Sequence, residues 1–206
     1  MIENGYRLIK LQTSHRKNID CKYYSSNNAK KAVIFVGGIG GGWDSPAKEL
    51  YSKLATKLVS NEISCLRIRY RHPTDLDECT IDVIAGIKFL ENNMIQSVGL
   101  VGHSLGGAVV IKAAAASPNI VKTVVTPSTQ SYGAAESVSK LGQKRCSSLL
   151  IHGTDDDVLP SICSSYVYNK ASNPKHIILF EGAKHGLEES AGEIYQTTYQ
   201  WLLENL

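Results

Sequence analysis

Short apolar runs that alternate with helical patterns are the feature that most constrains the fold of this chain. The runs are rich in β-branched residues, and their apolar character is continuous, as expected for strands that are covered on both faces. They lie at residues 32–36, 63–70, 97–102, 120–126, 148–152 and 177–180. Strands of this kind, separated by helices, predict an α/β fold with a mostly parallel, doubly wound sheet.

The chain before the first of these runs has a different pattern. Residues 6–11 and 19–24 flank a polar turn, which predicts an antiparallel hairpin at the edge of the sheet. Of the 206 residues, 43% are hydrophobic and 20% are charged, which excludes a disordered or fibrous chain. The sequence contains no internal repeat or linker, so we expect residues 1–206 to form a single domain.

The balance of charged residues and the length of the apolar runs limit the kinds of partner that this protein can bind. The chain has 22 Lys and Arg against 19 Asp and Glu and no long basic block, so we expect no nucleic acid partner. No apolar run is long enough to cross a bilayer, and we expect no membrane association. The polar N-terminus lacks a signal peptide, and the five cysteines are odd in number and widely spaced. These features predict a soluble protein of the cytoplasm.

Two helix starts are visible in the sequence. Ser45 precedes Pro46, which places a capping hydroxyl before a proline at the first helical position. Residues 74–77 read Thr-Asp-Leu-Asp and resemble a capping box that starts at Thr74.

A serine lies where an apolar strand ends and an apolar helix begins. The segment is Gly102-His103-Ser104-Leu105-Gly106-Gly107. A serine exposed on so sharp a turn needs small neighbours, because larger side chains would collide with the adjacent strand or helix. The pattern predicts a nucleophilic Ser104; the alternative is a tight turn with an incidental serine.

Together with two later motifs, this segment resembles the α/β-hydrolase superfamily, in particular its small lidless esterases and dienelactone-hydrolase-like members. The acid motif of that superfamily is matched by residues 152–160, His-Gly-Thr-Asp-Asp-Asp-Val-Leu-Pro, and the histidine motif by residues 182–186, Gly-Ala-Lys-His-Gly. The resemblance implies the α/β-hydrolase fold, without a cap domain, and a catalytic triad of Ser104, Asp156 and His185. The order Ser, Asp, His along the chain is the order that this fold uses.

The chemistry of such a triad follows from its residue types. An imidazole can take the proton of a serine hydroxyl and return it to a leaving group, and a buried carboxylate orients the ring. Asp155 and Asp157 flank Asp156 and are the rival acids. A metal site built from His152 and the three aspartates is a weaker alternative, so we expect neither a metal nor a cofactor.

Residues 37–42 form a glycine-rich turn after the strand at residues 32–36. By analogy with related enzymes, the backbone N–H groups of Ile39 and Leu105 form the oxyanion hole, with Gly40 as the alternative to Ile39. A turn with a purely structural role is the competing interpretation. A nucleotide-phosphate loop fails on spacing, because neither glycine pattern of such loops fits here.

Other residues near the predicted site have less specific interpretations. We expect His103 to pack under the nucleophile and His152 to be structural. Arg71 lies on the same rim, as a solvated residue or as a contact for an acidic substrate. Residues 128–146 can hold one short helix and no cap, and Tyr132 with Gly133-Ala134-Ala135 could line an open pocket.

The leading hypothesis is therefore a serine hydrolase that cleaves an ester, thioester or related acyl bond of a small molecule through an acyl-serine intermediate. A non-catalytic binding protein on a hydrolase scaffold is one alternative. An acyltransferase or peptidase that uses the same triad is another. The substrate-binding residues, the acyl group and the oligomeric state are left open by the sequence.

Overall fold

The computed structural model describes residues 5–117, 120–143 and 145–206. The strands are β1 (Arg7–Gln12), β2 (Asn18–Tyr24), β3 (Lys31–Val36), β4 (Ile63–Arg69), β5 (Ser97–Gly102), β6 (Val121–Pro127), β7 (Ser147–Gly153) and β8 (Lys175–Phe180). The helices are α1 (Pro46–Val59), α2 (Leu76–Asn92), α3 (Leu105–Ala116), α4 (Lys140–Gln143), α5 (Ile162–Lys170) and α6 (Ala191–Asn205).

The strands form one sheet of eight in the order β1-β2-β4-β3-β5-β6-β7-β8. Strand β2 is antiparallel to both β1 and β4, and every pairing from β4 to β8 is parallel. The mostly parallel sheet and the N-terminal antiparallel hairpin are therefore confirmed.

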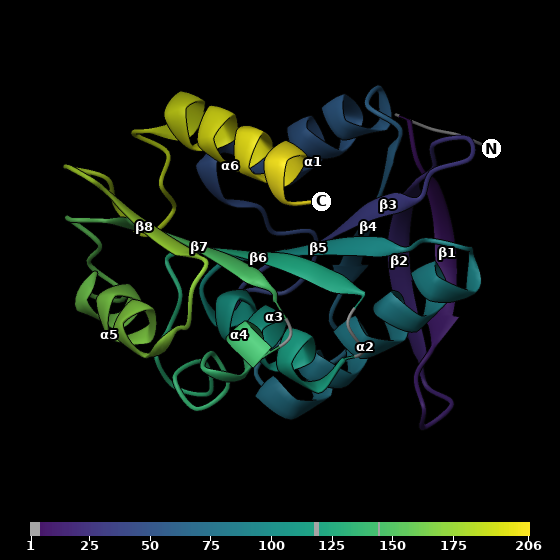
Figure 1. Ribbon diagram of the computed structural model, residues 1–206, viewed down its shortest axis with the longest axis horizontal. Coiled ribbons are helices and arrows are strands. Elements are labelled where there is room, and N and C mark those ends of the chain that lie inside the picture. Colours follow the sequence, from purple (N-terminus) through teal and green to yellow (C-terminus); the bar gives the residue numbers. More distant parts are fainter. Residues whose placement is uncertain (1–4, 118–119, 144) are drawn as a thin grey trace.

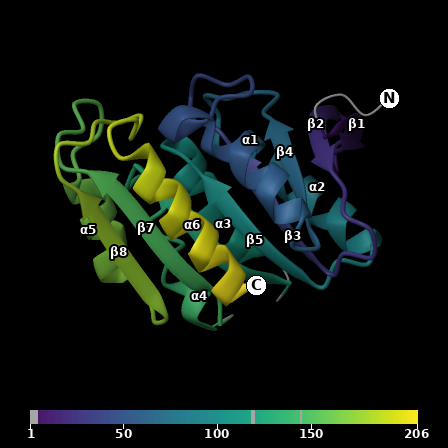
Figure 2. The same cartoon turned by 90° about the horizontal axis from the view of Figure 1, so that it is seen from above.

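Helices cover both faces of the sheet. Helices α1 and α6 lie side by side on one face, and α2, α3, α4 and α5 lie on the other (Figures 1 and 2). Each face has its own apolar core: Phe35 and Leu54 belong to the first, and Leu66 and Val109 to the second. This two-sided cover explains why the strands read as continuous apolar runs.

The strand boundaries agree closely with the sequence prediction. Strand β5 has the predicted bounds, and the others differ by a few residues at their ends. The largest difference is in β8, which begins at Lys175 rather than at residue 177, because Lys175 and His176 pair with β7. These two residues are polar, so the apolar pattern could not include them.

The start of α1 differs from the predicted proline-led helix. Residues 47–49 have φ angles of 50°, 52° and 66°, in the left-handed region, and regular helix follows them. The Ser45 hydroxyl accepts a hydrogen bond from the N–H of Tyr51 at 2.9 Å, beyond this turn. The N–H of Ala47 donates to the carbonyl of Gly186 at 2.7 Å. A tertiary contact, which a local pattern cannot reveal, therefore accompanies the unusual start.

The cap of α2 lies one residue later than predicted. The side chain of Asp75 accepts hydrogen bonds from the N–H groups of Asp77 and Glu78, both at 3.0 Å. The predicted capping residue Thr74 is one position too early. Asp75 and Glu78 have the spacing of a capping box, with an aspartate in place of the usual serine or threonine.

Beyond β6 the chain carries only a small amount of regular structure before β7. Within residues 128–143, the single helix is the four-residue α4, as expected for a fold without a cap domain. None of the helices in the described ranges has the length and apolar character needed to span a membrane.

The position of the α2 cap can be tested by stability. Asp75→Ala removes an acceptor shared by two backbone N–H groups, and we expect it to lower the free energy of unfolding by about 1 kcal/mol. Thr74→Ala is the matched control and should change it by less than about 0.5 kcal/mol. Urea denaturation of the three proteins measures the difference. A larger loss for Thr74→Ala than for Asp75→Ala would contradict the assignment.

Candidate active site

Ser104 occupies a strained turn between β5 and α3. Its φ and ψ angles are 56° and −120°, a conformation that costs about 1–3 kcal/mol for a residue with a side chain. A Cβ on Gly102 would collide with the carbonyl of Gly106, and a Cβ on Gly106 with the carbonyl of Gly37. The two glycines thus allow the close backbone contacts around Ser104.

His185 and Asp156 come together at the same edge of the sheet. Asp156 follows β7, and His185 follows β8. The Nδ1 of His185 lies 2.7 Å from Oδ2 of Asp156. The side chain of Asp156 is fully buried, whereas Asp155 and Asp157 are exposed. Of the three consecutive aspartates, Asp156 is the one that faces His185.

Four hydrogen bonds surround the Asp156 carboxylate. Its Oδ1 accepts from the N–H groups of Val158 and Leu159 at 2.9 and 2.8 Å, and its Oδ2 contacts His185 and His152. Burial alone would raise the pKa of Asp156, but the hydrogen bonds from Leu159, His185 and Val158 outweigh it and hold the pKa below its ordinary value. The carboxylate is therefore ionised at neutral pH.

His152 contacts the acid directly, although the sequence pattern predicted only a structural place for it. Its Nε2 lies 3.0 Å from Asp156 Oδ2 and 2.9 Å from the carbonyl of Leu159. Both neighbours are acceptors, so Nε2 carries the proton and Nδ1 accepts from the Ser164 hydroxyl at 2.6 Å. The spacing of four residues between His152 and Asp156 was the available signal.

The backbone of His185 is held from two sides. Its carbonyl accepts from Nε2 of His103 and from the hydroxyl of Ser128, each at 3.0 Å. The rings of His103 and His185 lie 4.8 Å apart between centroids. His103, which precedes Ser104, therefore packs against His185, the candidate base. The turn that holds Ser104 and the loop that holds His185 lie at the same edge of the sheet.

His103 is buried and neutral. Burial lowers the pKa of His103 below its ordinary value, although the hydrogen bond to His185 and the charges of Asp44 and Asp156 act in the opposite direction. Its Nδ1 has no hydrogen-bond partner in the described part of the chain and lies 4.0 Å from Oδ2 of Asp44. This environment agrees with the expectation that His103 packs beneath the turn.

Within the described ranges no hydrogen bond joins the Ser104 hydroxyl to another group, so the pairing of Ser104 with His185 stays a prediction. Such a bond often tightens only when a substrate is bound. Ser104 is 8% exposed, and its N–H donates to the carbonyl of Pro127 at 3.0 Å. The backbone contact fixes the turn, and the hydroxyl keeps its capacity to donate and accept.

The glycine-rich turn lies directly beside Ser104. A Cβ on Gly38 would stand 3.3 Å from the Cβ of Ser104, so this backbone approaches the nucleophile closely. The N–H of Gly38 points to Asp44 Oδ2 at 3.4 Å. Ile39 follows Gly38, and Leu105 begins α3. The assignment of oxyanion donors to Ile39, or its alternative Gly40, and Leu105 stays a prediction.

Two expectations about the rim are wrong. Arg71 is not a solvated residue, because its guanidinium pairs with Asp82 at 2.6 Å and with Glu78 at 2.5 Å, and these carboxylates compensate its charge. Its side chain is 12% exposed. Tyr132 and Gly133 line a pocket with residues of α2 and α3, and Ser104, Asp156 and His185 are not among its lining residues. Ala134 and Ala135, which were expected to line the same pocket, are buried in the core.

The described ranges contain no group of three or more His, Cys, Asp and Glu side chains that could hold a metal ion. The predicted rival, a site of His152 with three aspartates, fails on geometry, since Asp155 and Asp157 are exposed while His152 is buried.

Comparisons with solved structures agree with the fold. The dienelactone hydrolase of Anabaena variabilis superposes with a TM-score of 0.81 at 20% identity, covering 98% of each chain. Est1E from Butyrivibrio proteoclasticus gives 0.79 at 14% identity, with 96% of this chain and 98% of that chain covered. The esterase domain of a Rhodothermus marinus protein gives 0.76 at 15% identity, with 95% and 97% covered.

A search of curated protein sequences finds no match. Residues 44–193, which include Ser104, Asp156 and His185, match the sequence profile described as the Alpha/beta hydrolase family. The sheet order, the strained serine turn and this match lead to one conclusion: the chain belongs to the α/β hydrolase family.

Proposed function

We propose that the protein is a serine hydrolase that cleaves an ester, thioester or related acyl bond of a small molecule. The observation that carries this proposal is the 2.7 Å contact between His185 and Asp156 at the edge where the strained Ser104 turn also lies. A carboxylate, an imidazole and an alcohol at one edge of a sheet form the arrangement that activates a serine.

Asp156 determines which nitrogen of His185 can act as a base. Because the carboxylate is ionised and only accepts hydrogen bonds, Nδ1 of His185 carries a proton and Nε2 keeps its lone pair. That lone pair can take the proton of the Ser104 hydroxyl. The imidazolium that results is stabilised by the negative charge of Asp156, which stays ionised throughout.

The reaction then proceeds in two halves. The Ser104 oxygen bonds to the acyl carbon, and the carbonyl electrons move to oxygen as an oxyanion. When the oxyanion collapses, the bond to the leaving group breaks and His185 donates its proton to that group. Water then attacks the acyl-Ser104 ester with His185 again as the base, which releases the acid and restores the hydroxyl.

The oxyanion is stabilised by backbone donors. In this proposal the N–H groups of Ile39, or of Gly40, and of Leu105 face it, supported by the closeness of the Gly38 backbone to Ser104 and by the position of Leu105 at the start of α3. One such donor contributes about 3–4 kcal/mol to the transition state.

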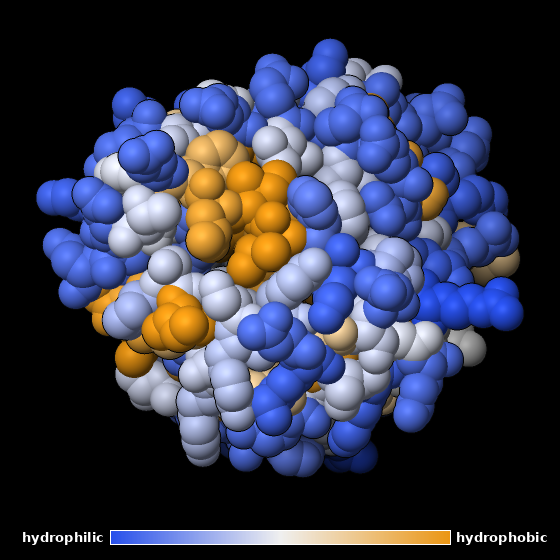
Figure 3. Space-filling model, turned by 60° about the vertical axis from the view of Figure 1, so that its left-hand side comes forward, coloured by the Kyte–Doolittle hydropathy of each residue, from blue (hydrophilic) through white to orange (hydrophobic). Residues whose placement is uncertain are grey.

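The surroundings of the site favour a small apolar acyl group. Ile39 lies in the loop after β3, Val158 in the loop after β7 and Ile162 at the start of α5, and they are 60%, 64% and 68% exposed. Apolar side chains also gather in an area on the β8 side of the molecule (Figure 3). Within residues 128–143 the four-residue α4 is the single helix, which is too little structure to enclose a long lipid chain.

The identity of the nucleophile can be tested with a fluorophosphonate probe, which reacts with activated serines. We expect the wild-type protein to be labelled on Ser104, and Ser104→Ala to lose both labelling and more than about a thousandfold of the ester turnover. Mass spectrometry of the labelled peptide, with p-nitrophenyl esters and acyl thioesters as substrates, measures both effects.

Ser139→Ala is the control, since Ser139 is exposed and lies outside the site. It should label and turn over substrate as the wild type does. Circular dichroism should show that Ser104→Ala keeps the fold, because the glycines allow the turn. Folded wild-type protein that is not labelled, and that cleaves no acyl substrate, would count against the proposal.

His152 provides a second test, because it donates to the oxygen of Asp156 that also faces His185. His152→Phe removes this donor, and we expect the rate of labelling at Ser104 to fall about tenfold, since a hydrogen bond to a charged group contributes about 1.5–3 kcal/mol. His152→Gln can restore a donor and should recover part of the rate.

The matched control is Ser164→Ala, which removes the partner of His152 Nδ1 and leaves the contact of Nε2 with Asp156 in place. We expect it to change the labelling rate by less than about threefold. Equal losses in Ser164→Ala and His152→Phe would mean that His152 supports only the packing, and not the orientation of Asp156.

A further inference from the structure

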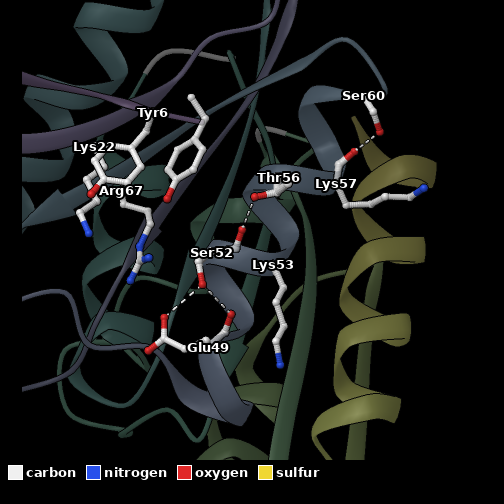
Figure 4. Close-up of a pocket in the computed structure, with 10 residues that line it drawn as sticks. Tyr6, Lys22, Glu49, Ser52, Lys53, Thr56, Lys57, Ser60 and Arg67 are labelled. Carbon is white, nitrogen blue, oxygen red and sulfur yellow. Dashed lines mark hydrogen bonds between the residues drawn. The ribbon is translucent and has the colours of Figure 1, made fainter. Parts of the chain in front are cut away.

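A second cavity lies away from the candidate active site, between α1 and the N-terminal hairpin (Figure 4). Its volume is about 860 Å³, and Ser104, Asp156 and His185 are not among its lining residues. The lining residues include Tyr6 before β1, Lys22 and Tyr24 of β2, Glu49 and Ser52 of α1, and Arg67 of β4. We call this cavity the α1 groove.

Arg67 is a buried cation without a carboxylate partner. It is 4% exposed, and one of its N–H groups donates to the carbonyl of Trp43 at 2.7 Å. The side chain of Tyr24 lines the same cavity. Among the described residues no Asp or Glu forms an ion pair with Arg67. Taking a guanidinium out of water costs several kcal/mol unless an opposite charge compensates it.

Arg71, unlike Arg67, has its positive charge compensated by carboxylates of the protein. Arg71 lies just beyond the same strand, β4, and binds the carboxylates of Asp82 and Glu78. Arg67 is buried on β4, and the acceptor of its hydrogen bond is the neutral carbonyl of Trp43. Among the described residues, the lack of a carboxylate partner is therefore a property of Arg67 and not of the β4 region as a whole.

Lys22 adds a second cation on the same face. It is directly opposite Arg67 in the antiparallel register of β2 and β4. Its Nζ lies 4.7 Å from the ring centre of Tyr6 and 4.6 Å from that of Trp43. Like charges at directly opposite positions destabilise a sheet, so an anion between them would relieve a repulsion as well as a desolvation cost.

The remaining walls of the α1 groove define where an anion fits. Lys22 and Arg67 extend toward the same space as Glu49 and Ser52, whereas Lys53 and Lys57 point away from them (Figure 4). Glu49 is the one carboxylate that lines the groove, and its Oε2 accepts from the Ser52 hydroxyl at 3.1 Å. Glu49 would repel an anion at its own end, so the anion fits at the end of Lys22 and Arg67.

We propose that the α1 groove binds a phosphate group through Lys22 and Arg67. A phosphate carries up to two negative charges and can accept hydrogen bonds from several directions at once, which suits cations that approach from adjacent strands. A planar carboxylate with one charge would compensate only one of them. The rings of Tyr6 and Tyr24, 5.2 Å apart, leave an aromatic wall for the organic part of a phosphate ester.

Isothermal titration calorimetry of the full chain at constant ionic strength tests this proposal, with inorganic phosphate and phenyl phosphate as separate probes. We expect saturable binding of one equivalent. Lys22→Gln and Arg67→Gln should each weaken the binding at least about tenfold, and Glu49→Gln should strengthen it severalfold. Tighter binding of phenyl phosphate indicates an organic phosphate as ligand, and equal binding indicates the free ion.

Two controls distinguish binding in the α1 groove from binding elsewhere on the protein. Lys140→Gln removes an exposed lysine outside the α1 groove and should leave the affinity unchanged. Ser104→Ala should also leave it unchanged, because the nucleophile lies outside the groove. If Arg67→Gln does not fold, Lys22→Gln decides, since Lys22 is only half-buried. No saturable binding, equal weakening in Lys140→Gln, or loss of binding in Ser104→Ala would overturn the proposal.

Discussion

Close backbone packing at the end of β5 is the constraint on which the candidate site depends. The absence of a Cβ at Gly102 and Gly106 lets the start of α3 approach both its own strand and the carbonyl of Gly37. This approach brings the glycine-rich turn against Ser104 and holds the serine at a φ of 56°. The positions of Ser104 and of the glycine-rich turn beside it therefore depend on the same two glycines, before any charged group is considered.

Hydrogen-bond acceptors then set the state of each histidine around that turn. The carbonyl of His185 requires a proton on Nε2 of His103, and burial keeps that ring neutral. The Asp156 carboxylate requires protons on Nδ1 of His185 and on Nε2 of His152. Each of the three rings therefore has one nitrogen whose hydrogen bond fixes its orientation, and for His185 that nitrogen is Nδ1.

Much of this arrangement could be predicted, because strands and motifs are local in the sequence. The apolar runs located the strands, and the position of Asp156 within its motif selected the aspartate that faces His185. The errors concern contacts between distant segments. The left-handed turn at residues 47–49 accompanies a bond to the loop after His185, and the burial of Arg71 depends on carboxylates from α2. No local pattern contains either partner.

Asp156, Arg71 and Arg67 differ in how the protein compensates the charge of a side chain that is removed from water. Asp156 is surrounded by four hydrogen bonds, and Arg71 binds two carboxylates, so each charge is stabilised by the protein itself. Arg67 is 4% exposed, and its hydrogen bond goes to a neutral group, the carbonyl of Trp43. A neutral acceptor does not compensate the charge of the guanidinium. The protein therefore compensates the charges of Asp156 and Arg71 with its own groups. Arg67 instead lines the α1 groove, where the charge of an external anion can compensate it.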